Sequence, residues 1–250
     1  MRVGLQHVRQ SPRMKIVLLR VFLFFLQSSA ITALMPLVAR RLGSGAGGFT
    51  LLVSSMGVGA IVAALTVPSL RDRVPRDRIV AIGTLVISIM AAVVAWAPSL
   101  WIAATAVWVA GIAWISTANT LTVSAQFTLP NWVRARGMSI YQMALMGGAA
   151  SGSALWGQVA GWTDVPTALL SAALAGPLLA LLTRRLRLDA HQDDDLRPAP
   201  PVEVPAPVIP LEPQEGPVMV TVEYLIEPAQ AEAFHTVMQE TRRARLRQGA

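Results

Sequence analysis

Charged side chains crowd into one short stretch, Arg71–Arg78, in which arginines alternate with aspartates. Guanidinium and carboxylate groups this close form charge-assisted hydrogen bonds, and a carboxylate also accepts bonds from the amides at a helix N-terminus. Such a network can bias two conformations of similar energy. We predict that Asp72, Arg73 and Arg76 form a conformational-switch loop. The alternative interpretation is a solvated turn that only sets the topology.

Long apolar runs flank this turn, Phe49–Leu70 before it and Ile79–Ala97 after it. A charge at the centre of a membrane helix costs roughly 2.5–3.5 kcal/mol, so the turn must lie in water or among lipid headgroups. The whole chain is 54% hydrophobic and 14% charged, whereas soluble domains carry about 25% charged residues. The sequence therefore predicts an all-α integral membrane protein.

The hydrophobic runs predict six transmembrane helices between residues 16 and 183. Each run is long enough for a hydrocarbon core about 30 Å thick, and backbone groups in lipid find partners only within a helix. The remaining four runs are Ile16–Ala39, Leu100–Val123, Met138–Ala160 and Val165–Thr183.

Basic residues alternate between the two sides of these spans, which predicts the orientation. Short loops rich in Lys and Arg stay in the cytoplasm, and the opposite side holds only Arg40, Arg41 and Asp164. We expect a multi-pass protein of the inner (plasma) membrane with both termini cytoplasmic. The net charge of +7 is explained by this rule, and no basic groove or reader motif indicates nucleic-acid binding. The cytoplasmic basic residues are Arg2, Arg9, Arg13, Lys15, the four arginines of the turn, Arg134, Arg136, Arg184, Arg185 and Arg187.

Polar residues within the spans are the candidates for a substrate path, and Gln27, Asn119 and Gln142 are the large amides among them. The alternative for each is a hydrogen bond between packed helices. Arg20 lies one turn inside the first span, where we favour a side chain that reaches back to the headgroups over one that faces a substrate. No acidic residue lies in the middle of a span, so this part of the chain offers no evident proton carrier.

The chain contains no cysteine and only three scattered histidines, His7, His191 and His235. This pattern gives no metal-ligand spacing and no catalytic pair, so we expect no metal, no cofactor and no enzymatic activity. The fifth span carries small residues at helical spacing, which let helix backbones approach closely. We interpret them as packing within one bundle, with a seam between two copies as the alternative. They are Ala149, Ser153, Gly157 and Gly161, with Gly148 and Gly152 beside them.

After Thr183 the composition changes to proline and acidic residues, which is typical of an extended linker. The alternation over Val218–Ile226 predicts a strand, and Pro228 opens a predicted helix. We divide the chain into a cytoplasmic N-terminal segment (1–15), a six-helix transmembrane domain (16–183), a cytoplasmic linker (184–217) and a partial α+β domain (218–250).

The turn also resembles a loop of major facilitator superfamily transporters, which has the form G-x-x-x-D-R-x-G-R-R. Asp72, Arg73 and Arg76 match this form, whereas Pro68, Pro75 and Asp77 replace Gly, Gly and Arg. Longer strings in the same order, from about Gly4 to Ala250, resemble the transmembrane secretion effector branch, which includes enterobactin-exporter-like proteins. These strings are GLQHVRQSP, PLVARRLGSGAGGFTLL, RDRIVAIGTL, AQFTLPNWVRARGMSIYQ, GSALWGQVAGW and GPVMVTVEYLIEP.

In that branch these strings belong to the C-terminal half and to a small ferredoxin-like α+β domain similar to antibiotic-biosynthesis monooxygenases, of which this chain has only the start. The resemblance implies half of a twelve-helix bundle whose substrate path lies between two halves. It implies secondary-active efflux of a small amphipathic molecule by alternating access. The implied partners are the lipid bilayer and either a missing N-terminal half or a second copy of the chain. The alternatives are a non-transporting fragment and a membrane-tethered α+β interaction module.

Overall fold

The computed structural model describes residues 11–71, 74–130, 133–183, 224, 226–227 and 230–248. In this part of the chain the regular structure is helical and contains no strand. The chain divides into two units, of which the first runs to Ala190 and the second begins at His191. The helices are α2 (Pro12–Arg41), α3 (Gly45–Arg71), α4 (Arg76–Trp96), α5 (Leu100–Thr128), α6 (Arg134–Trp162), α7 (Val165–Thr183) and α8 (Ala231–Gln248).

The six expected spans lie within helices except for Ala97, which follows the end of α4, and the sixth span coincides with α7. Five of the described helical segments are long and apolar enough to cross a membrane, in α2, α3, α4, α5 and α7. Helix α6 is long enough for a crossing, but glycine, serine and the amides Gln142 and Gln158 lower its hydropathy. The prediction of an all-helical membrane domain is therefore confirmed. Of the six predicted transmembrane helices, five of the described ones meet the length and hydropathy of a membrane span.

Local sequence explains where the helices begin and end. Ser11 caps the start of α2 by accepting a hydrogen bond from the amide of Met14 (3.4 Å), and Pro12 stands at the first helical position, where no amide is needed. The turn from α2 to α3 uses Gly43 and Gly45, with φ of +69° and +52°. Glycine adopts this left-handed conformation without the steric cost of a Cβ atom.

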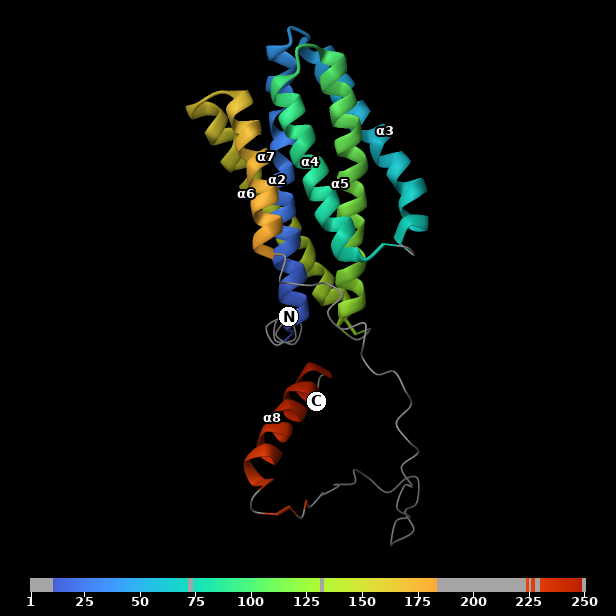
Figure 1. The fold of residues 1–250 in the computed structure, drawn as a ribbon, viewed down its shortest axis with the longest axis vertical. Helices are drawn as coiled ribbons and strands as arrows, with labels where there is room; N and C mark the ends of the chain where they lie inside the picture. The colour runs from blue at the N-terminus through green and yellow to red at the C-terminus, as the bar shows by residue number, and fades with distance from the viewer. Residues whose placement is uncertain are drawn as a thin grey trace. The chain divides into compact units, whose positions relative to one another are not determined.

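Helix α2 is the centre of the first unit and packs against each of the helices from α3 to α7. On one side of it α6 and α7 pack together, and on the other side α5 packs against α3 and α4 (Figure 1). Helix α4 also packs against α7, which closes a three-helix group around one face of α2. This group of α2, α4 and α7 contains the candidate site.

Glycines allow the closest of these contacts. A Cβ atom on Gly148 or Gly152 of α6 would collide with backbone carbonyl oxygens of α2, those of Phe22 and Leu26. By contrast, Gly157 and Gly161, further along α6, have open space around them. The small-residue stripe of the fifth predicted span therefore packs against α2 through its two flanking glycines.

In the second unit, α8 confirms the predicted helix after Pro228. The ring of Tyr224 lies 5.3 Å from that of Phe234 between ring centroids, so the segment before the helix contacts it. The predicted strand Val218–Ile226 lies mostly outside the described residues, and Tyr224 and Ile226 have no regular structure. The ferredoxin-like tail therefore stays a prediction.

Candidate functional site

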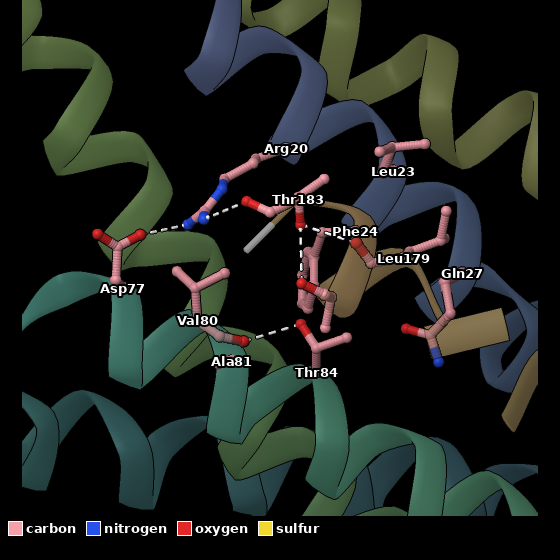
Figure 2. Close-up of a pocket in the computed structure, with 11 residues that line it drawn as sticks. Arg20, Leu23, Phe24, Gln27, Asp77, Val80, Ala81, Thr84, Leu179 and Thr183 are labelled. Atoms are coloured by element: carbon pink, nitrogen blue, oxygen red, sulfur yellow. Dashed lines mark hydrogen bonds and ion pairs between the residues drawn. The ribbon is translucent and has the colours of Figure 1, made fainter. Parts of the chain in front are cut away.

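A partly buried ion pair joins three helices at one end of the bundle. The Arg20 side chain, 9% exposed, donates through Nη1 to Asp77 Oδ1 at 2.5 Å. Its Nη2 donates to the backbone carbonyl of Thr183 at 3.0 Å. Figure 2 shows Arg20 between these two partners. One guanidinium group thus connects α2 with the start of α4 and the end of α7.

The helix ends explain why these charges are stable there. Asp77 lies in the first turn of α4, where the helix dipole favours a negative charge, and Thr183 is the last residue of α7, where it favours a positive charge. The side chain of Arg20 was expected to reach back to the headgroups. The structure shows it turned into the bundle instead, because a carboxylate and a free helix carbonyl at the same depth satisfy it better than lipid does.

A cavity of about 250 Å³ extends from this ion pair between α2, α4 and α7, and we call it the α2–α4–α7 cavity. Its walls are mainly apolar, formed among others by Leu23, Phe24, Val80 and Leu179 (Figure 2). Thr84 and Thr183 also line it, and their hydroxyl groups donate to carbonyls of their own helices. These hydroxyls therefore offer only lone pairs to a molecule in the cavity.

Gln27 lines the other end of the cavity, at the middle of α2. The side chain is 1% exposed. Its Nε2 donates to Ser88 Oγ of α4 and to the carbonyl of Ala172 of α7, both at 3.4 Å. Its Oε1 has no hydrogen-bond partner within the described part of the chain. The cavity therefore runs from a charged end of the bundle to a polar group near mid-depth.

At the opposite end of the bundle, Arg41 of α2 donates to the carbonyls of Ala95 (2.8 Å) and Ala97 (3.3 Å), at the end of α4. Asp164 caps α7 by accepting a hydrogen bond from the Thr167 amide at 2.7 Å. Hydrogen bonds from Thr167 hold the pKa of Asp164 below its usual range, and the charge of Arg41 adds to this effect. A second, wider hollow is lined by Arg41 and Asp164.

The structure brings only part of the predicted site together. Asp72 and Arg73 of the switch loop lie outside the described residues, so their role stays a prediction. Arg76 begins α4, and its guanidinium carbon lies 4.7 Å from the ring centroid of Phe127 on α5. Of the candidate amides, Gln27 lines the cavity, whereas Asn119 is half-buried on α5 and Gln142 is exposed on α6. These two do not line the cavity.

Asp77 and the Thr183 carbonyl were missed as partners of Arg20. The available signal was the arginine itself, since a charge inside a span requires a partner at its depth. Asp77 lies two positions before the third predicted span, and in the sequence it stands out only as a departure from a loop motif. Among the described residues, no group of three or more His, Cys, Asp or Glu side chains could hold a metal ion.

The long apolar helices and the cavity with a charged end are the features to be set against known families. A comparison with curated proteins gave no match. A model described as transmembrane secretion effector, within the major facilitator superfamily, matches residues 1–250, so the chain belongs to this family of membrane transport and secretion proteins.

Proposed function

We propose that this chain exports a small amphipathic molecule by alternating access, as the C-terminal half of a secondary-active major facilitator transporter of the enterobactin-exporter-like branch. The observation that carries the proposal is the α2–α4–α7 cavity. It leads from the Arg20–Asp77 pair to Gln27 at the middle of α2, between helices that are mainly apolar. Polar groups at this depth in a membrane bundle are costly, and they mark substrate and ion pathways.

In this proposal the end of the bundle that holds Arg20 and Asp77 faces the cytoplasm, together with both termini. Support comes from the arginines near this end, including Arg76, Arg78 and Arg134, because basic residues of short loops stay in the cytoplasm.

The Arg20–Asp77 pair would stabilise one of the two conformations that alternating access requires, the one in which the ends of α2, α4 and α7 are together. The pair holds the ends of α2, α4 and α7 together, and any movement that separates these ends must break a short ion pair and a helix-end hydrogen bond. A transporter needs contacts that differ between its states. We propose that Asp72, Arg73 and Arg76, directly before Asp77 in the chain, belong to the same switch.

The substrate path would include more than this cavity. We propose Gln27 as its mid-depth contact, and Asn119 and Gln142 as contacts on surfaces of α5 and α6 that an N-terminal half or a second copy would complete. The exposed amide of Gln142 supports this, since such a group is better satisfied by another protein surface or by water than by lipid. A monooxygenase-like tail domain is part of the same proposal, without a catalytic role.

Transport can be tested in everted membrane vesicles from cells that produce the chain alone or together with a separately encoded N-terminal half. Uptake of Nile red (neutral), ethidium (cationic) and carboxyfluorescein (anionic) is followed by fluorescence, with and without an uncoupler. We expect uncoupler-sensitive uptake of at least one dye. Gln27→Leu should reduce this uptake, whereas Ser28→Ala, a neighbouring buried position outside the cavity, should not. Lack of uptake in both arrangements, with the chain inserted and folded, would refute the proposal.

A further inference from the structure

The oxygen of the Gln27 side chain is a buried hydrogen-bond acceptor without a donor in the described part of the chain. The orientation of the amide is fixed by its surroundings. Its nitrogen faces the Ala172 carbonyl, which can only accept, and Ser88 Oγ, whose proton goes to the Thr84 carbonyl. The reverse orientation would place two acceptors against each other. The atom left without a partner is therefore the amide oxygen, which Figure 2 shows on the side of the cavity, and this buried acceptor requires a donor.

The charges that line the cavity cancel. Among the described residues that line the cavity, Arg20 and Asp77 are the only ionic ones, and they are paired with each other. An anionic ligand would have to compete with Asp77 for the guanidinium, and a cationic ligand would have to compete with Arg20 for the carboxylate. Each exchange breaks a partly buried ion pair, which is costly. The cavity therefore favours an uncharged molecule.

The remaining lining defines the rest of the ligand. Leu23, Phe24, Val80 and Leu179 present apolar surface, and the threonine hydroxyls present lone pairs only. Arg20 Nε, which is buried and has no acceptor among the described residues, is the one donor left. Arg20 and Gln27 are seven positions apart on α2, or about 10.5 Å along the helix axis. The volume of about 250 Å³ lies just below the range of about 300–1,000 Å³ for pockets that bind drug-sized molecules.

We propose that the α2–α4–α7 cavity is a binding site for a small, uncharged, largely apolar molecule that donates a hydroxyl hydrogen bond to Gln27 Oε1, of the chemical class of the alkylphenols. The aromatic ring packs against Phe24 and the aliphatic wall, and the hydroxyl group satisfies the buried carbonyl. That such a molecule is also carried across the membrane rests on the proposed function, whereas its binding does not.

Photolabelling of the full chain in lipid nanodiscs tests the site directly. The probe is a trifluoromethyl-diazirine phenol, and adducts are mapped by mass spectrometry. We expect adducts on the cavity segments of α2, α4 and α7. 4-Butylphenol should displace the probe, whereas 4-butylanisole, in which a methyl group replaces the donated hydrogen, should do so about tenfold less well, the effect of one hydrogen bond. 4-Butylbenzoate, an anion, should also compete poorly.

Variants test whether the preference for butylphenol over butylanisole depends on Gln27 Oε1. Gln27→Leu should remove the preference for butylphenol over butylanisole, and Ser28→Ala, which changes a buried hydroxyl outside the cavity, should keep it. If Gln27→Leu does not fold, the comparison of competitors on the unchanged chain still decides. Equal displacement by butylphenol and butylanisole would overturn the proposal. So would adducts spread over the lipid-facing surface, or displacement by added lipid but not by butylphenol.

The same molecules separate this inference from the proposed function. Binding without uptake into everted vesicles would retain the site and refute transport of this class. Uptake of dyes without labelling of the cavity would support transport and overturn the site.

Discussion

Breaking the Arg20–Asp77 pair should lower the free energy of unfolding, and the exposure of the two side chains sets the lower and upper limits of this effect. The exposed fractions are 9% for Arg20 and 26% for Asp77, so the pair lies between two known cases. Exposed pairs contribute about 0–1 kcal/mol, and removing one partner of a fully buried pair costs about 3–5 kcal/mol. We expect a coupling of about 2 kcal/mol between the two side chains.

The assay is a double-mutant cycle of Arg20→Met, Asp77→Asn and the double variant, with thermal unfolding in detergent followed by tryptophan fluorescence. Met keeps much of the arginine stem, and Asn keeps the shape of the carboxylate. For a chain of this size each 1 kcal/mol shifts Tm by about 2–4 °C, so each single variant should lose roughly 4–8 °C. The double variant should be less destabilised than the sum of the two, because neither charge is then left alone.

Arg78→Met is the matched control, since it removes the same charge from an exposed position of the same turn and should change stability by less than about 0.5 kcal/mol. Additivity of Arg20→Met and Asp77→Asn to within about 0.5 kcal/mol would refute the reasoning, because it would mean that the two groups do not interact in the folded protein.

Further predictions concern helix packing and helix ends. Gly152→Val should lower Tm, because its side chain would collide with the Leu26 carbonyl of α2, whereas Gly157→Val, with open space around it, should have a much smaller effect in the same thermal scan. Arg41→Leu should cost about 1.5–3 kcal/mol, measured by the same unfolding assay, since it removes two hydrogen bonds from a charged group to the end of α4. The pKa of Asp164 is lowered in the folded protein, so its ionised carboxylate stabilises the fold. This stabilisation is complete above the unfolded-state pKa of about 3.9 and is lost as pH falls through the folded-state pKa. Asp164→Asn keeps a capping side chain, so it should remove this part of the acid dependence of Tm, and an unchanged pH profile would contradict the assignment.

Much of the helical architecture follows from the sequence. The apolar run from Ile79 predicts α4, although the helix begins three residues earlier, at Arg76 within the charged turn. The run Val165–Thr183 predicts α7 to the residue. Apolar runs of this length predict helices because lipid leaves backbone groups no other partner. The sequence also indicates that Gln27 lies at mid-depth, since depth is counted along the helix at a fixed rise per residue.

The rotation of each helix and the identity of its neighbours were decided by tertiary structure. In water a polar stripe separates the exposed face of a helix from its packed face, but in lipid both faces are apolar. The sequence therefore could not show that Arg20 faces Asp77, 57 positions away, or that Gln27 and Ser88 meet across α2 and α4. It also could not show that Gly152 packs against α2 while Gly157 stays open. Composition and run length determined that these helices exist and at what depth their polar groups lie, and packing alone determined which of those groups meet to form the cavity.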